Sequence, residues 1–334
     1  VWSEYTVNSD IKNLSNQYIV QSNWKNPDMG LELTTIGPLV RELKIQYPSL
    51  VKNYYRWDGV TSNVSSGNKV FREGLQIGDS SFLFMYGFTL VYGNLHTALS
   101  EPFSVVISEE KAMKYFGRTN VVGEMLTIES FSNSKHGFVV TGILKNRESN
   151  SITKLNREND NQIFIPASSA TYFSRSLDSW NNPYIVGMLE LQNGVKPSDL
   201  TRPMQLLLDK NAPPDIAKNM QPYLVPLKNY YLQQNNGLAG KMIITVSCIA
   251  FFILLMAMIN FINISIGKAS SRIKEIGVRK VMGGMRKQII FQFLTEYVLL
   301  ALLATIFSFV IFISARSYIS DVLGRNIPML SAFP

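Results

Sequence analysis

Cysteine is almost missing from this chain of 334 residues. The single cysteine, Cys248, lies inside a long apolar segment, so the residues before Met242 contain no disulfide. A domain built from those residues must be held together by its apolar core alone. That is unusual for a eukaryotic secreted domain and ordinary for a bacterial extracytoplasmic one.

Recognisable catalytic and metal-binding motifs are also missing. His96 and His136 are the only histidines, and neither has a partner at triad or metal-ligand spacing, so plain surface positions explain them better. The segment 237–241 has only a superficial likeness to a phosphate-binding loop, because its spacing is wrong and no Ser or Thr follows the lysine. Glu109 and Glu110 could form an acid–base pair, but the first turn of a helix explains them better. The sequence therefore predicts no catalytic, cofactor-binding or metal-binding residue, and we expect no enzyme activity.

Positive charge is concentrated in one place. The formal net charge is +8, and seven of the 32 lysines and arginines lie between Lys268 and Lys287, where Glu275 is the only acid. The residues before this segment show no basic run interleaved with aromatic residues. Attraction to anionic lipid and membrane topology therefore explain the charge better than nucleic-acid binding does.

Two long apolar segments flank the basic one. Residues 242–267 carry no charge over 26 residues, which as a helix is about 39 Å, enough to cross a hydrocarbon core. The second segment, 288–314, contains one charge, Glu296. A buried core helix of a soluble protein is the alternative, but such helices seldom exceed about 14 apolar residues. The sequence predicts two transmembrane helices.

The basic segment fixes the predicted topology. Short loops rich in Lys and Arg stay in the cytoplasm, so residues 268–287 should form a cytoplasmic elbow and residues 1–235 a domain outside the cell. Residues 315–334 should begin another outer loop. The polar residues 1–4 are no signal peptide, so we expect a further membrane span upstream of this sequence.

The outer segment shows the pattern of an α+β domain, with short apolar strands and capped helices bounded by Gly, Asn and Pro. Residues 232–240 read as a flexible joint, which could be a plain linker or a functional hinge. The sequence predicts helices over 36–45, 109–116 and 199–210, and strands over 103–107, 125–128, 138–144, 162–165 and 184–191.

Three polar residues lie within the apolar segments: Asn260 and Asn263, which share a helix face, and Glu296. Polar side chains in lipid usually face protein and pair across helices, so an Asn–Glu contact between the spans is our prediction. An ion-transport site is a sharper alternative, and Glu296 could also extend to the membrane interface.

The elbow itself reads as a short amphipathic helix over 273–282. Val278, Val281, Met282 and Met285 would then share one face, and Gly283-Gly284 would end the helix. Such a helix can lie on anionic lipid or dock into a groove of a cytoplasmic partner, and charge alone does not decide between the two.

The elbow and the following span resemble the signature region of FtsX-like ABC transporter permeases, the superfamily of MacB and the lipoprotein-releasing permeases. The family motif is close to R-x-x-E-I-G-[VI]-x-[RK]-A-[LM]-G-A, and a span that begins near F-L-x-E follows it. Phe293, Leu294 and Glu296 match this second element, and Val281 and Gly284 stand where the family often has alanine. The residues that match the first element are Arg272, Glu275, Ile276, Gly277, Val278, Arg279, Lys280, Met282 and Gly283.

A second resemblance lies in the outer segment. Residues 81–117, SFLFMYGFTLVYGNLHTALSEPFSVVISEEKAMKYFG, are similar to the MacB-like periplasmic core domain in their phenylalanine-rich turn, their S-V-V-I-S-E run and a helix ending Y-F-G. Residues 138–144 and 163–166 fit later strands of that domain. The two resemblances cover nearly the whole chain in the expected order, with the FtsX-like region over about 242–334.

The resemblance implies the permease of an ABC efflux or export system in the bacterial inner membrane, multi-pass, with its large domain in the periplasm. The matched elbow residues would form the coupling helix that docks on a cytoplasmic ABC ATPase, a separate chain that hydrolyses ATP. Its motion would reach the outer domain by mechanotransmission. Family members pair two permease copies or modules. Each module has four spans, and two of them are in this sequence. The family can also work with a periplasmic adaptor or an outer-membrane component. A non-transporting transmitter that activates a cell-wall hydrolase, and an extracytoplasmic receptor, are the alternatives.

Overall fold

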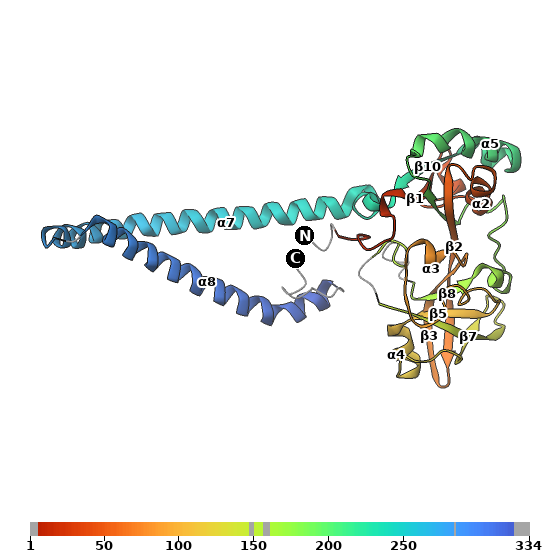
Figure 1. The fold of residues 1–334 in the computed structure, drawn as a ribbon, viewed down its shortest axis with the longest axis horizontal. Coiled ribbons are helices and arrows are strands. Elements are labelled where there is room, and N and C mark those ends of the chain that lie inside the picture. Colours follow the sequence, from red (N-terminus) through yellow and green to blue (C-terminus); the bar gives the residue numbers. More distant parts are fainter. Residues whose placement is uncertain (1–5, 147–149, 156–160, 284, 324–334) are drawn as a thin grey trace. The chain divides into compact units, whose positions relative to one another are not determined.

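The computed structural model describes residues 6–146, 150–155, 161–283 and 285–323 (Figure 1). The chain divides into two compact units, one running to Ser247 and the other starting at Cys248. The described part of the first unit combines strands with short helices. In the second unit the described residues form two long helices joined by a turn.

The described part of the first unit contains ten strands. They are β1 (Gln17–Trp24), β2 (Val51–Ser66), β3 (Lys69–Gly78), β4 (Leu90–Gly93), β5 (Ser104–Ser108), β6 (Met125–Glu129), β7 (Lys135–Leu144), β8 (Ile163–Pro166), β9 (Val186–Leu191) and β10 (Met220–Pro226). Its α-helices are α2 (Gly37–Gln46), α3 (Phe82–Met85), α4 (Glu109–Phe116), α5 (Thr201–Asn211) and α6 (Pro214–Asn219), and 3-10 turns include η3 (Ala167–Phe173) and η4 (Pro197–Leu200). The long helices are α7 (Leu227–Val281) and α8 (Arg286–Leu323).

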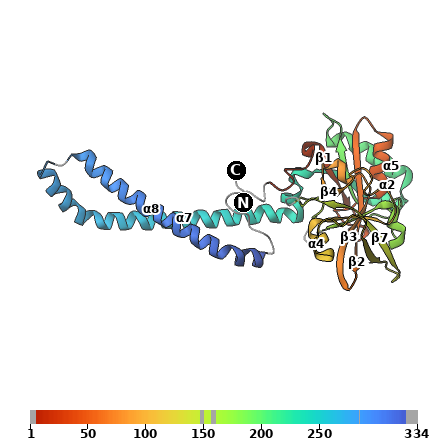
Figure 2. The ribbon, with the colours of Figure 1, turned by 60° about the horizontal axis from the view of Figure 1, so that its bottom comes forward.

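All ten strands belong to one mixed sheet. Its order is β10-β1-β9-β2-β3-β8-β5-β7-β4, and β6 pairs with β2 and β7 beside that path. The β3–β8 and β5–β7 pairs are parallel, and the other pairs are antiparallel. In both views α2 lies beside α5, and α4 lies apart from them over another part of the sheet (Figures 1 and 2). The predicted α+β class is confirmed.

Local signals explain the elements that the sequence predicts correctly. Ser108 accepts a hydrogen bond from the backbone N–H of Lys111, which caps the start of α4. Gly117 ends that helix at φ 70°, a left-handed conformation that glycine adopts without a Cβ penalty. The predicted helices and strands between residues 36 and 210 are all present, with ends shifted by one or a few residues and with η4 preceding α5.

Five strands were not predicted: β1, β4, β10 and the two strands of the long hairpin, β2 and β3. The hairpin pairs Trp57 with Gly78 near its base and Ser66 with Lys69 at its tip, and Gly67 turns the chain at φ 56°. Many hairpin residues are polar, so the sequence pattern there is weak. Burial comes from neighbours distant in sequence, because β2 also pairs with β9 and β6.

The two apolar segments are helical and solvent-facing in the structure. The stretches Gly237–Gly267 and Ile290–Ser320 are each 31 residues long, with mean hydropathies of 2.8 and 2.7 in their most apolar windows. Only 6% and 0% of those windows are buried within the protein. A soluble core helix would be mostly buried, so the alternative of two core helices is wrong. By length and composition both helices can cross a bilayer.

Candidate functional site: the turn between the two long helices

A glycine ends α7 and opens the turn. The backbone N–H of Met282 donates to the carbonyl of Val278 at 3.1 Å, and that of Gly283 donates to Lys280 at 3.2 Å. Gly283 has φ 86°, which favours glycine. The predicted end of the helix at Gly283-Gly284 is confirmed for Gly283. Gly284 lies outside the described residues.

The matched motif residues lie together at this end of α7. Those from Arg272 to Lys280 are in its last turns, and Met282 and Gly283 are in the turn that follows. The elbow helix is therefore the continuation of the first apolar helix and not a separate short helix. Met285 lies beyond the end of α7, so the predicted face shared by Val278, Val281, Met282 and Met285 is wrong for Met285.

Apolar side chains at this tip are exposed. Val278 is 61% exposed, Val281 90% and Met282 82%, with the exposed Lys280 between them. Apolar groups held in a defined turn beside positive charge can bury their surface against another protein or against lipid. The tip is therefore suited to docking.

The two long helices touch above the turn. Phe261 of α7 and Tyr297 of α8 have ring centroids 5.3 Å apart with planes at 74°. Asn260 precedes Phe261 and Glu296 precedes Tyr297 in the sequence, so the contact brings the backbones of these polar residues to the same level of the hairpin. The Asn–Glu pairing itself stays a prediction.

The start of α7 is anchored in the first unit. Leu227 and Tyr230 are buried in one of its core clusters, and the Asn8 side chain donates to the Leu227 carbonyl at 3.0 Å. The predicted flexible joint over 232–240 is wrong, because these residues are helical. Gly237 nevertheless has φ 71°, so the helix has a left-handed residue at that point.

A buried arginine ties three segments of the first unit together, and the sequence analysis did not find it. Arg56 of β2 is 4% exposed and donates to both carboxylate oxygens of Asp79 at 3.0 Å and to Asp178 at 2.8 Å. Burial alone would raise the pKa of Asp178, but the hydrogen bond and charge of Arg56 outweigh burial and lower it. The partners are 23 and 122 residues away in sequence, so no local pattern marks them.

His136 and Glu109, which were weighed as catalytic residues in the sequence, contact other parts of the first unit. His136 stacks on Phe103 with centroids 3.9 Å apart, and Glu109 lies in the first turn of α4, where its carboxylate accepts from the backbone of Asn146. Within the described residues, no three His, Cys, Asp or Glu side chains gather as metal ligands would. The contacts of His136 and Glu109 are thus an aromatic stacking and a hydrogen bond to the backbone.

Two family models match this chain. The MacB-like periplasmic core domain matches residues 2–205, and the FtsX-like permease C-terminal region matches residues 247–333. Both motifs found in the sequence lie within the matched ranges. The resemblance to MacB-like and FtsX-like permeases is therefore confirmed.

Curated relatives cover most of this chain and are longer than it. The macrolide export ATP-binding/permease protein MacB of Bdellovibrio bacteriovorus is 25% identical over 222 residues, 66% of this chain and 32% of the relative. The pyoverdine export ATP-binding/permease protein PvdT of Pseudomonas syringae pv. tomato is 25% identical over 248 residues, 73% of this chain and 35% of the relative. The chain spans about a third of the length of these relatives.

A solved structure shares the fold of the first unit. It is a domain of a candidate permease protein from Porphyromonas gingivalis, with a TM-score of 0.53 and 19% identity, covering 65% of this chain and 92% of that chain. At this identity the likeness concerns the fold alone.

Proposed function

This chain belongs to the FtsX-like permeases that carry a MacB-like periplasmic core domain, and on that premise we propose that it is the permease subunit, or one half of it, of an ABC export system. In this proposal the chain hydrolyses no ATP itself. A separate cytoplasmic ABC ATPase docks on the turn between α7 and α8, and its closure moves the hairpin and the outer domain.

The exposed tip of the hairpin is the observation that carries the proposal. Val281 and Met282 are 90% and 82% exposed at the end of a helix whose first residues, Leu227 and Tyr230, belong to the core of the first unit. One element, α7, thus contains both the docking surface and an anchor in the outer domain. The names of the MacB and PvdT relatives contain the words "ATP-binding", which supports an ATPase partner for this chain.

The proposed location is the bacterial inner membrane, with residues 1–235 in the periplasm and the elbow 268–287 in the cytoplasm. The seven basic residues of the elbow support this orientation because such loops are hard to translocate. The docking residues are those of the matched motif, from Arg272 to Gly283. We further propose that two copies or modules assemble, and that an adaptor or outer-membrane component meets the periplasmic domain.

The test is co-purification with an ATPase. We would express the chain with ABC ATPases of the same genome that lack a permease region, solubilise the membranes and ask which ATPase co-elutes. Val281→Asp and Arg279→Glu should reduce co-elution at least tenfold, because each places an acid in the docking turn. Leu206→Asp is the matched control, since Leu206 is an apolar residue of α5 that is 50% exposed in the other unit.

Co-elution that depends on the tip supports the proposal. Binding that survives Val281→Asp and Arg279→Glu would place the ATPase elsewhere on the chain. A chain that recruits no ATPase would instead behave as an extracytoplasmic receptor.

A further inference from the structure

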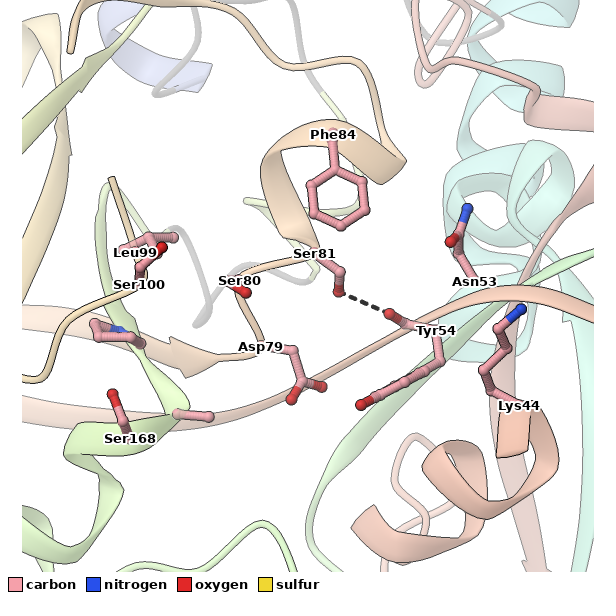
Figure 3. A pocket seen from close by; sticks show the side chains of 12 residues that line it. Lys44, Asn53, Tyr54, Asp79, Ser80, Ser81, Phe84, Leu99, Ser100 and Ser168 are labelled. Carbon is pink, nitrogen blue, oxygen red and sulfur yellow. Dashed lines mark hydrogen bonds between the residues drawn. The ribbon is translucent and has the colours of Figure 1, made fainter. Parts of the chain in front are cut away.

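A cavity of about 360 Å³ opens in the first unit, apart from the docking turn. It lies where α2, β2, the segment from Asp79 to Phe84, the end of the β4–β5 connection and the start of η3 meet (Figure 3). Its volume is within the range of about 300–1,000 Å³ typical of small-molecule sites. Five separate segments therefore form a wall around a ligand-sized space.

The two charged residues in the wall already have protein partners. The Asp79 carboxylate accepts from the Arg56 side chain through both oxygens and from the Arg56 backbone at 2.9 Å. Lys44 Nζ donates to the carbonyl of Val51 at 3.3 Å. The two charges are opposite in sign, so the wall has little net charge. Asp79 is paired with Arg56, and Lys44 keeps its ammonium charge, because its partner is a neutral carbonyl.

Hydroxyl groups make up most of the remaining polar wall. Ser80 and Ser168 are exposed, and their hydroxyls have no partner among the described residues. Ser81 donates to the Tyr54 carbonyl at 2.7 Å and Ser100 donates to the His96 carbonyl at 3.1 Å, which leaves the lone pairs of both oxygens able to accept. The wall thus offers both hydrogen-bond donors and acceptors without charge.

Two aromatic residues add apolar surface between these hydroxyls. Tyr54 and Phe84 line the cavity from different elements, and Phe84 is 39% exposed (Figure 3). Burial and the nearby Asp79 raise the pKa of Tyr54, so its phenol stays protonated and can donate. An aromatic ring has a flat apolar face, and a tyrosine adds a polar tip to it.

We propose that this cavity binds a neutral saccharide. A sugar ring has hydroxyls that donate and accept around its edge and a C–H face that packs on aromatic rings, and the wall supplies a counterpart to each. An ammonium ligand would need an unpaired carboxylate, which the wall does not present, because Asp79 is paired with Arg56. The Arg56–Asp79 bonds and the Ser81–Tyr54 bond hold the cavity in shape before any ligand arrives.

The experiment uses the full chain in lipid nanodiscs, because sugar-headed detergents would compete for the cavity. Ligand-observed saturation-transfer NMR would be recorded with chitotriose and cellotriose as neutral probes, and with glutamate and putrescine as charged ones. We expect saturable binding of at least one trisaccharide, tighter than the binding of either charged probe. Ser168→Phe, which fills the cavity from an exposed position, should raise the Kd at least tenfold.

Ser132→Phe is the matched control, since Ser132 is an exposed serine in the β6–β7 turn that does not line the cavity. It should bind as the unaltered chain does, and Phe84→Ala should weaken binding severalfold. The proposal is overturned if neither trisaccharide binds saturably, if Ser168→Phe leaves the Kd unchanged, or if a charged probe binds more tightly than the sugars.

Discussion

Phe261 and Tyr297 meet edge to face, with ring centroids 5.3 Å apart, and so join α7 to α8. In the part of the chain that the structure describes, this pair is an aromatic contact between the two long helices. It defines which residues of the hairpin lie at the same level, Asn260 and Glu296 among them.

Removing this ring pair should loosen the hairpin. We expect a coupling energy between Phe261→Ala and Tyr297→Leu of about 1 kcal/mol, because edge-to-face pairs contribute about 0.5–1.5 kcal/mol beyond their buried area. A double-mutant cycle on unfolding in mixed micelles measures it. Phe251→Ala is the control, since Phe251 packs on Phe252 of its own helix, and its coupling to Tyr297→Leu should be near zero.

Glu296 should hold the two helices together by hydrogen bonding. Glu296→Ala should destabilise the hairpin by about 1 kcal/mol, the usual size for polar contacts between membrane helices, and Glu296→Gln should keep most of that stability. Thr295→Ala is the matched control, because the Thr295 hydroxyl donates to Phe291 of its own helix. Unchanged hairpin stability in Glu296→Ala would remove the predicted Asn–Glu contact.

Arg56 should be the most sensitive charged residue of the first unit. Arg56→Ala leaves the Asp79 carboxylate, 14% exposed, without its partner, so we expect a loss of about 3–5 kcal/mol in the free energy of unfolding. Urea unfolding followed by tryptophan fluorescence reports it, since all four tryptophans precede residue 181. Arg118→Ala breaks only the exposed pair with Glu124 and should cost less than about 1 kcal/mol.

Acid should destabilise the first unit through Glu73. Burial would raise the pKa of Glu73, but hydrogen bonds from Lys111 and Lys114 at 2.5 and 2.7 Å outweigh burial and lower it below 4.5. A lowered folded-state pKa gives stability above pH 4.5 that is lost as the pH falls further. Glu73→Gln should therefore cost about 2 kcal/mol at pH 7 and much less near pH 3, measured by urea unfolding at each pH.

Asp58 should show the opposite dependence on pH. Burial raises the pKa of Asp58 above 3.8 and outweighs the opposing charge of Arg175, whose Nε lies 3.7 Å from Asp58 Oδ2, too far for a hydrogen bond. Its ionised form therefore costs stability as the pH rises through the folded-state pKa. Urea unfolding at pH 3 and pH 7 measures this effect. Relative to the unaltered chain, the free energy of unfolding of Asp58→Asn should be higher at pH 7 than at pH 3. If the relative stability of Asp58→Asn instead fell from pH 3 to pH 7, as expected for Glu73→Gln, this account of the two carboxyls would be contradicted.

The sequence predicts elements whose signals are local. The helix after Ser108 has its cap, first-turn acids and terminal glycine within ten residues, so α4 is found almost to the residue. The apolar helices and the break at Gly283 are visible for the same reason. The motif residues proposed for docking also lie at one end of one helix.

The remainder depends on partners that are far apart in the chain. The β2–β3 hairpin is polar along much of its length and becomes buried only when β9 and β6 pair with it. Arg56 lies in a strand that gives no sign of the two aspartates that bind it, and the cavity takes its wall from five segments. Residues 232–240 lie within α7 although Gly237 is left-handed, and their polar, glycine-containing composition does not indicate a helix.

Topology labelling tests the central claim, that a cytoplasmic turn is joined by two membrane helices to a domain outside. The chain with Cys248→Ser would carry either Val281→Cys in the turn or Ser132→Cys in the first unit, and intact spheroplasts would be treated with a membrane-impermeant maleimide. We predict that Ser132→Cys is labelled at once and that Val281→Cys is labelled only after the membrane is permeabilised. Labelling of Val281→Cys in intact cells, with Ser132→Cys protected, would contradict the account.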